Sequence, residues 1–96
     1  MIEAKRHIRR TAQFKKDYRK SKAQGKDVNL LLSIINMLAN DDPLPAKHHD
    51  HALTGNWDGF RECHITPDWL LVYRKLDNGE LLLVLTRLSS HSNLRF

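Results

Sequence analysis

Five polar residues in the second half of the chain could together perform acid–base chemistry on a phosphodiester: His51, His64, Asp68, Arg87 and His91. An imidazole has an unperturbed pKa of about 6.5, so it can give or take a proton near neutral pH. A guanidinium keeps its charge and can hold two phosphate oxygens through parallel N–H groups. Cleavage of RNA by its own 2′-hydroxyl needs a base, an acid and a fixed cation, and it needs no metal ion.

Hairpin geometry predicts that most of these residues meet at one end of a sheet. Asn78 and Gly79 tolerate the positive φ angles of a two-residue type I′ turn, which would place Arg87 opposite Leu70 and Trp69 opposite Leu88.

The position of His64 depends on the loop that follows it. A two-residue loop pairs His64 with Trp69, and a four-residue loop pairs it with Leu71. In both cases His64, the turn at Asp68 and Arg87 lie at the same end of the sheet. The backbones of His64 and Arg87 would be about 10 Å apart, and His91 would follow the end of the last strand. The register does not place His51.

Two helices are predicted between a short opening strand over residues 2–9 and the polar cluster. Thr11 can cap the first helix, which is basic with a thin apolar stripe, and Gly25 can end it in a left-handed conformation. Asp27 can cap the second helix. Its apolar residues recur with helical spacing and predict the buried face: Val28, Leu31, Leu32, Ile35, Leu38 and Ala39.

Three strands are predicted after the helices, over residues 60–65, 69–76 and 81–88. The last one is nearly continuously apolar, as expected of a central strand covered on both faces. Pro67 cannot adopt positive φ, so the first connection should be a longer loop rather than a type I′ turn. The order β-α-α-β-β-β predicts an α+β fold, with a mainly antiparallel sheet and two helices packed on one face.

Length and composition limit the class of protein. The 96 residues fit one domain over 1–96, and no apolar run approaches the roughly 20 residues of a membrane span. Cys63 is the only cysteine, which excludes a disulfide framework within the chain and makes the cytoplasm the expected compartment.

Positive charge is concentrated at the N-terminal end. Residues 1–26 contain ten Lys or Arg against two acids, whereas the remaining residues are net negative, and the whole chain has a net charge of +5. Such a segment is either a solvated helix face or a surface that binds a polyanion.

Each candidate also has an ordinary structural interpretation. A single histidine at a strand end is usually structural, Asp68 after Pro67 is a common turn residue, and Arg87 could simply pair with Asp68. The histidines at 48, 49, 51 and 64 with Cys63 raise the question of zinc, but they lack the spacing of known zinc motifs. A half-buried strand thiol such as Cys63 is usually inert.

Three stretches within residues 50–92 resemble the YafQ branch of the RelE/ParE toxin superfamily. They are Asp50-His51-x-Leu53-x-Gly55-x-Trp57, Phe60-Arg61-Glu62-x-His64-Ile65-x-Pro67-Asp68-Trp69-Leu70-Leu71-Val72-Tyr73, and Arg87-x-x-x-His91-Ser92. The resemblance implies a RelE-like fold and a bacterial type II toxin that enters the ribosomal A site, cuts mRNA there without a metal or other cofactor, and is silenced by a cognate antitoxin.

The resemblance also implies roles for individual residues. His51, His64 and Asp68 match acid–base and substrate-positioning residues, Arg87 matches the phosphate-stabilising arginine, and His91 matches the proposed general acid. Trp69 matches a residue beside the site. Phe96 corresponds to a C-terminal phenylalanine that contacts substrate, but Arg95 displaces it by one position.

The resemblance also implies a function for the basic first helix. Its cations, among them Lys15, Lys16 and Arg19, would bind ribosomal RNA phosphates, and the same surface could receive an acidic antitoxin. Two other interpretations remain open. One is a non-catalytic relative that acts by occupying RNA or another target, and the other is a zinc-stabilised RNA-binding module.

Overall fold

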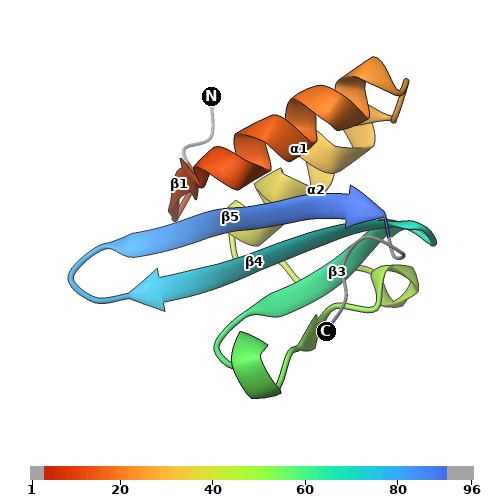
Figure 1. The fold of residues 1–96 in the computed structure, drawn as a ribbon. Helices are drawn as coiled ribbons and strands as arrows, with labels where there is room; N and C mark the ends of the chain where they lie inside the picture. Colours follow the sequence, from red (N-terminus) through yellow and green to blue (C-terminus); the bar gives the residue numbers. More distant parts are fainter. Residues whose placement is uncertain (1–3, 91–96) are drawn as a thin grey trace.

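The computed structural model describes residues 4–90, in which two helices pack against a five-stranded sheet (Figure 1). The predicted α+β order is confirmed, with one additional short strand and two single-turn 3-10 helices before the three long strands. In chain order the elements are β1 His7–Arg10, α1 Ala12–Ala23, α2 Val28–Ala39, the 3-10 turn Ala46–His48, β2 His51–Ala52, the 3-10 turn Gly55–Trp57, β3 Arg61–Thr66, β4 Trp69–Asp77 and β5 Leu81–Ser90.

The helices begin and end where the sequence predicts. The side chains of Thr11 and Asp27 accept hydrogen bonds from the backbone N–H groups three residues later, and Gly25 has a φ of +77°. The buried face of α2 includes Ile34, which was not predicted. Leu32 was predicted to be buried, but it is 51% exposed, at the edge of the apolar face, where it lines an open hollow with Ile35.

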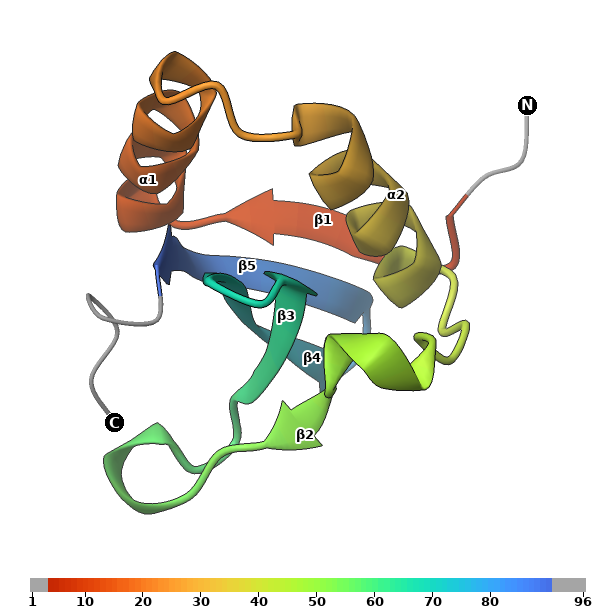
Figure 2. The same ribbon diagram turned by 90° about the vertical axis from the view of Figure 1, so that its right-hand side faces the viewer.

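The sheet has the strand order β1-β5-β4-β3-β2, with β1 parallel to β5 and the other pairs antiparallel. Both helices cover the same face (Figure 2). The prediction that residues 81–88 form a strand covered on both faces is wrong. Strand β5 buries mainly its helix-facing residues, whereas the first five residues of β4 are all buried.

The last hairpin turn has three residues rather than two. Asp77 pairs with Leu81, and Gly79 has a φ of +90° while Asn78 does not have positive φ, so the type I′ turn does not form. A β-bulge follows, because Thr86 is an extra residue on β5. The longer turn and the bulge each shift the register by one residue, so Arg87 lies opposite Val72, not opposite Leu70 as predicted.

The same two shifts place Leu88 opposite Leu71, not opposite Trp69 as predicted. Leu85 and Leu88 are three residues apart, and the extra residue lets both of them face the helices.

The connection at Pro67 is shorter than predicted. Strand β3 ends at Thr66 and β4 begins at Trp69, so only two residues lie between paired strands. One extra residue on β3 shifts the register, and His64 therefore pairs with Leu70, which lies between the two predicted partners.

Two apolar clusters cover the sheet. The larger one lies between the helices and the sheet and includes Phe14, Leu31, Trp69, Tyr73 and Leu85. On the opposite face, Leu70 and Val72 are covered by partly buried apolar residues of the β2–β3 region: Leu53, Trp57 and Phe60. In the part of the chain that the structure describes, neither helix is long and apolar enough to cross a bilayer.

Candidate active site

Arg87 is held at the edge of β5 by Asp17 of α1. The Nε of Arg87 and the backbone N–H of Leu88 both donate to Asp17 Oδ2, each at 2.9 Å, and Gln13 Nε2 donates to Oδ1 at 3.0 Å. Strand β1 pairs only with Leu82–Leu85 of β5, so α1 rather than a strand flanks the rest of this edge. The buried carboxylate satisfies the N–H group that a neighbouring strand would otherwise bind.

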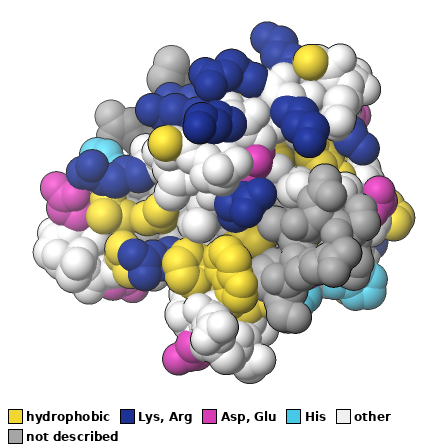
Figure 3. Space-filling model, in the orientation of Figure 1, with side chains coloured by type: hydrophobic (Ala, Val, Ile, Leu, Met, Phe, Trp, Pro, Cys, Tyr) yellow, Lys and Arg dark blue, Asp and Glu magenta, His cyan; other side chains and the backbone are white. Residues whose placement is uncertain are grey.

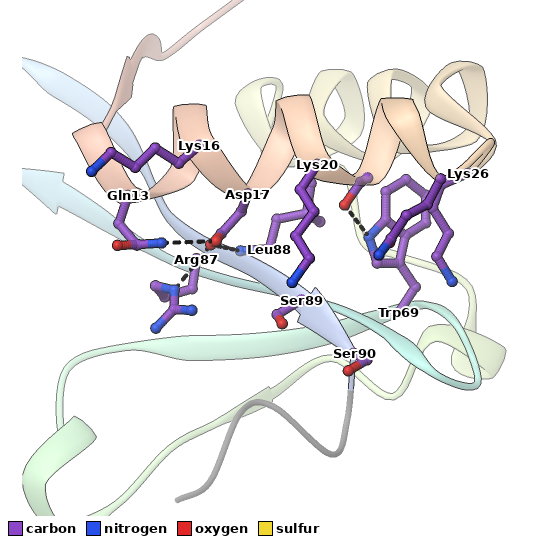
Figure 4. Close-up of a pocket in the computed structure, with 12 residues that line it drawn as sticks. Gln13, Lys16, Asp17, Lys20, Lys26, Trp69, Arg87, Leu88, Ser89 and Ser90 are labelled. Atoms are coloured by element: carbon purple, nitrogen blue, oxygen red, sulfur yellow. Dashed lines mark hydrogen bonds and ion pairs between the residues drawn. The ribbon is translucent and has the colours of Figure 1, made fainter.

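A groove of about 730 Å³ runs between α1 and the end of β5 (Figure 4). Among the residues that the structure describes, its cations are Lys16, Lys20, Lys26 and Arg87, and its one carboxylate is Asp17. The remaining lining residues are Gln13, Ser21, Gln24, Trp69, Leu88, Ser89 and Ser90. This combination of cations and hydroxyl groups suits an extended anionic backbone such as that of RNA.

Two of the predicted histidines meet at a buried carboxylate. The Nε2 atoms of His51 and His64 lie 3.7 Å and 3.5 Å from the same oxygen, Oε1 of Glu62. His51 Nδ1 lies 2.6 Å from the carbonyl oxygen of His49. Because a carbonyl can only accept, Nδ1 carries the proton and a neutral His51 has its lone pair on Nε2.

The neighbouring histidines hold His64 in place. His48 Nδ1 lies 2.7 Å from the carbonyl oxygen of His64, and the His49 ring packs edge-on against the His64 ring with centroids 5.5 Å apart. His48 is buried, so it supports the backbone of β3 and does not face solvent.

Arg87 and His64 lie on the same face of the sheet. His64 pairs with Leu70 and Arg87 with Val72, and directly paired residues share a face. Leu70 and Val72 belong to the same apolar cluster on the face away from the helices. Two strand spacings, about 10 Å, separate the strands that carry His64 and Arg87.

Trp69 lies at the floor of the groove and not on its surface. It is 1% exposed, and its indole Nε1 donates to Ser21 Oγ at 3.2 Å (Figure 4). Its ring faces are covered by the core, so in this structure Trp69 shapes the groove rather than offering a stacking surface.

Of three further predicted site residues, Asp68, His91 and Phe96, the structure describes only Asp68. Asp68 is exposed in the two-residue turn between β3 and β4. His91 and Phe96 lie outside the described residues, although His91 directly follows Ser90, which lines the groove.

The three predicted RNA-binding cations are exposed on α1 but do not all line the groove. Lys16 lines it, whereas Lys15 and Arg19 line a smaller hollow together with Arg10 and Phe14. Lys and Arg side chains gather over the region of α1 at the top of the molecule (Figure 3).

Asp17 and Glu62 were not among the predicted site residues. Glu62 is two residues before His64, so strand alternation alone indicates that both share a face. Asp17 is the only acid in the first helix, which is a weaker signal, because its partner lies 70 residues away.

Cys63 is placed where nucleophilic chemistry is disfavoured. Its side chain is fully buried in the core, and this burial raises the pKa of the thiol to about 12. Burial also raises the pKa of Tyr73, whose hydroxyl donates to Asp50 at 2.5 Å.

Within residues 4–90, no three His, Cys, Asp or Glu side chains are arranged to hold a metal ion.

Comparison with known proteins identifies close relatives. Residues 6–96 match the family described as "Bacterial toxin of type II toxin-antitoxin system, YafQ". The chain is 38% identical to the mRNA interferase toxin YafQ of Escherichia coli K12 over 90 residues, which are 93% of this chain and 95% of the relative.

Two solved structures extend the comparison. The E. coli DinJ–YafQ toxin–antitoxin complex matches with a TM-score of 0.85 and 36% identity, over 96% of this chain and 99% of that chain. A metal-bound toxin from Helicobacter pylori matches with a TM-score of 0.83 and 42% identity, over 92% and 97%.

Proposed function

The chain belongs to the YafQ family of bacterial type II toxin–antitoxin toxins, and on this premise we propose that it is an mRNA interferase that cuts mRNA in the ribosomal A site. The cut is made by the ribose 2′-hydroxyl next to the scissile phosphate and leaves a 2′,3′-cyclic phosphate and a 5′-hydroxyl. The observation that carries the proposal is that His64 and Arg87 share one face of the sheet, while Arg87 also lines the cation-rich groove.

We assign the first proton transfer to His51 and His64, the two histidines beside Glu62. The Nε2 lone pair of His51 can take the proton of the 2′-hydroxyl, and the carboxylate of Glu62 stabilises the imidazolium that forms. His64 approaches the same carboxylate oxygen and provides a second imidazole at this position. Asp68, in the turn between β3 and β4, is proposed to position the substrate.

Charge develops on the phosphoryl oxygens as the 2′-oxygen attacks. The guanidinium of Arg87 is one-third exposed and fixed through Nε, so its two terminal nitrogens can hold these oxygens. The leaving 5′-oxygen must gain a proton, and we assign that step to His91, directly after the groove-lining Ser90.

Ribosome binding is assigned to the basic helix. Contacts between its exposed cations, Lys15, Lys16 and Arg19, and ribosomal RNA would give affinity without sequence preference. The DinJ–YafQ complex is the precedent for a protein partner, and a cognate antitoxin is therefore proposed for this chain.

The decisive experiment maps mRNA ends in a reconstituted translation reaction. Wild-type protein should create new 5′-hydroxyl ends within codons at the A site, and Arg87→Ala or His91→Ala should reduce this cleavage at least a hundredfold. Arg9→Ala is the charge-matched control, because Arg9 is exposed on β1 and pairs with Glu80 away from the groove. Translation arrest without new 5′-hydroxyl ends would contradict cleavage and support action by occupancy.

Metal independence needs its own test, since ribosomes require Mg²⁺. Phenanthroline, which removes transition metals and leaves Mg²⁺ in place, should not change the rate of cleavage. Loss of cleavage that zinc or copper restores would contradict the metal-free route.

A further inference from the structure

We propose that Asp17 is a positioning residue for the cleavage reaction, because it fixes the guanidinium of Arg87 with its terminal nitrogens available to the substrate. The inference rests on the proposed function, in which Arg87 holds the phosphate. Asp17 itself has no substrate contact in this scheme. Its effect would be transmitted through the 2.9 Å hydrogen bond from Arg87 Nε to Asp17 Oδ2.

The carboxylate is itself firmly held. Asp17 is 9% exposed, although it lies in the most basic part of the chain, and it accepts hydrogen bonds on both oxygens. Gln13 approaches one oxygen from the preceding turn of α1, and Leu88 approaches the other from β5. A carboxylate anchored on two elements can orient an arginine that it binds.

This geometry leaves the two terminal nitrogens of the Arg87 guanidinium available to bind another anion. Asp17 binds Nε alone, and it does not form the two-nitrogen fork that would use up the planar edge of the group. Figure 4 shows the terminal nitrogens of Arg87 pointing away from α1. An arginine fixed in this way loses little further freedom when a phosphate binds, which favours the transition state.

A purely structural role for Asp17 is the competing explanation, because the Leu88 hydrogen bond also ties α1 to β5. Asp17→Asn separates the two roles. The oxygen that accepts from the Leu88 N–H also accepts from Arg87 Nε, so the amide keeps the neutral Leu88 hydrogen bond but weakens the hold on the guanidinium by removing the charge. Asp27→Ala is the control for stability, since Asp27 caps α2 by accepting from the Leu30 N–H and does not line the groove.

The kinetic test uses full-length protein with programmed ribosomes under single-turnover conditions. Asp17→Asn should lower the cleavage rate constant by at least tenfold and change the half-saturating toxin concentration less than threefold. In an Arg87→Ala background the same substitution should have no further effect. Asp27→Ala should lower the melting temperature and leave the rate constant within twofold at a temperature where it is folded.

Two results would overturn the inference. One is an unchanged cleavage rate constant in Asp17→Asn, and the other is an equal fall in the rate constant when Asp17→Asn is made in wild-type protein and in Arg87→Ala. NMR supplies a readout that does not depend on cleavage. The Nε–Hε signal of Arg87, identified by its absence in Arg87→Lys, should exchange slowly in wild-type protein and rapidly in Asp17→Asn. If wild-type protein fails to cleave mRNA, the proposed function fails, whereas an Arg87 signal unaffected by Asp17→Asn refutes the positioning contact itself.

Discussion

His51 and His64 come from different strands, yet their Nε2 atoms approach the same oxygen of Glu62. The paired register explains this arrangement, because His51 lies directly opposite Glu62, and His64 is two residues further along the same face of β3. Glu62 is 4% exposed, so a buried carboxylate lies beneath two more accessible imidazoles. One carboxylate can thus orient both candidate acid–base residues.

Replacing Glu62 should therefore impair both histidines at once. Glu62→Gln keeps the shape of the side chain but removes its charge, and we expect cleavage to fall about tenfold or more while the protein remains folded. Glu80→Gln is the matched control, because Glu80 is exposed and its ion pair with Arg9 is long, at 3.7 Å. Single-turnover cleavage and circular dichroism provide the measurements. Wild-type cleavage by Glu62→Gln would show that the shared carboxylate does not contribute.

The fold could be predicted from the sequence because its signals are local. Thr11 and Asp27 cap helices, and Gly25 ends one, for reasons of backbone geometry that neighbouring residues alone determine. The two-residue strand at His51–Ala52 carries too short a pattern to be recognised. Its existence depends on pairing with β3, which is a tertiary effect.

The register could not be predicted because it depends on bulges. The three-residue turn and the extra residue at Thr86 each shift the pairing by one, which moves Arg87 from the predicted partner Leu70 to Val72. The bulge is favoured because Leu85 and Leu88 then both reach the core. The contact between Asp17 and Arg87 is likewise invisible in the sequence, since it forms where β1 stops short of the end of β5.

The cations of α1 should divide into two functional groups. Lys16 and Lys20 line the groove, whereas Lys15 and Arg19 point elsewhere on the same helix. Lys16→Ala with Lys20→Ala should weaken binding of a short RNA and reduce the slope of log affinity against log salt by about 1.4, at about 0.7 for each lost phosphate contact.

The paired variant Lys15→Ala with Arg19→Ala removes the same charge. It should leave the affinity for short RNA within twofold and weaken binding to ribosomes. Fluorescence anisotropy at several salt concentrations and ribosome pelleting separate these effects. Equal losses in both assays for both variants would indicate a general charge effect without a dedicated groove.

The single cysteine offers a direct test of the core. Burial raises the pKa of Cys63 to about 12, so almost no thiolate exists at pH 8 and the thiol is enclosed. Iodoacetamide should therefore modify native protein only as fast as it unfolds, and it should modify protein in guanidinium within minutes. Mass spectrometry counts the label. Rapid labelling of native protein with loss of cleavage would contradict the buried, non-catalytic assignment.

An ion-pair network at the other end of the sheet should control acid stability. Asp41 accepts hydrogen bonds of 2.7 Å from Arg6 and from Lys75, and Arg6 also binds Asp77 at 2.6 Å. The hydrogen bond from Arg6, followed by that from Lys75, lowers the pKa of Asp41 to about 2 from its ordinary 3.8. The stabilisation is thus complete above pH 3.8 and disappears as the pH falls towards 2.

Asp41→Asn should lower the free energy of unfolding by about 1 kcal/mol at pH 6, a modest loss because the carboxylate is one-third exposed. The difference from wild type should shrink between pH 4 and pH 2, because the wild-type carboxylate becomes neutral in that range. Asp42→Asn, at the exposed neighbouring position, should leave the stability within 0.5 kcal/mol of wild type. Urea unfolding at several pH values measures all three proteins. A constant difference down to pH 2 would show that the charge of Asp41 is not what stabilises the fold.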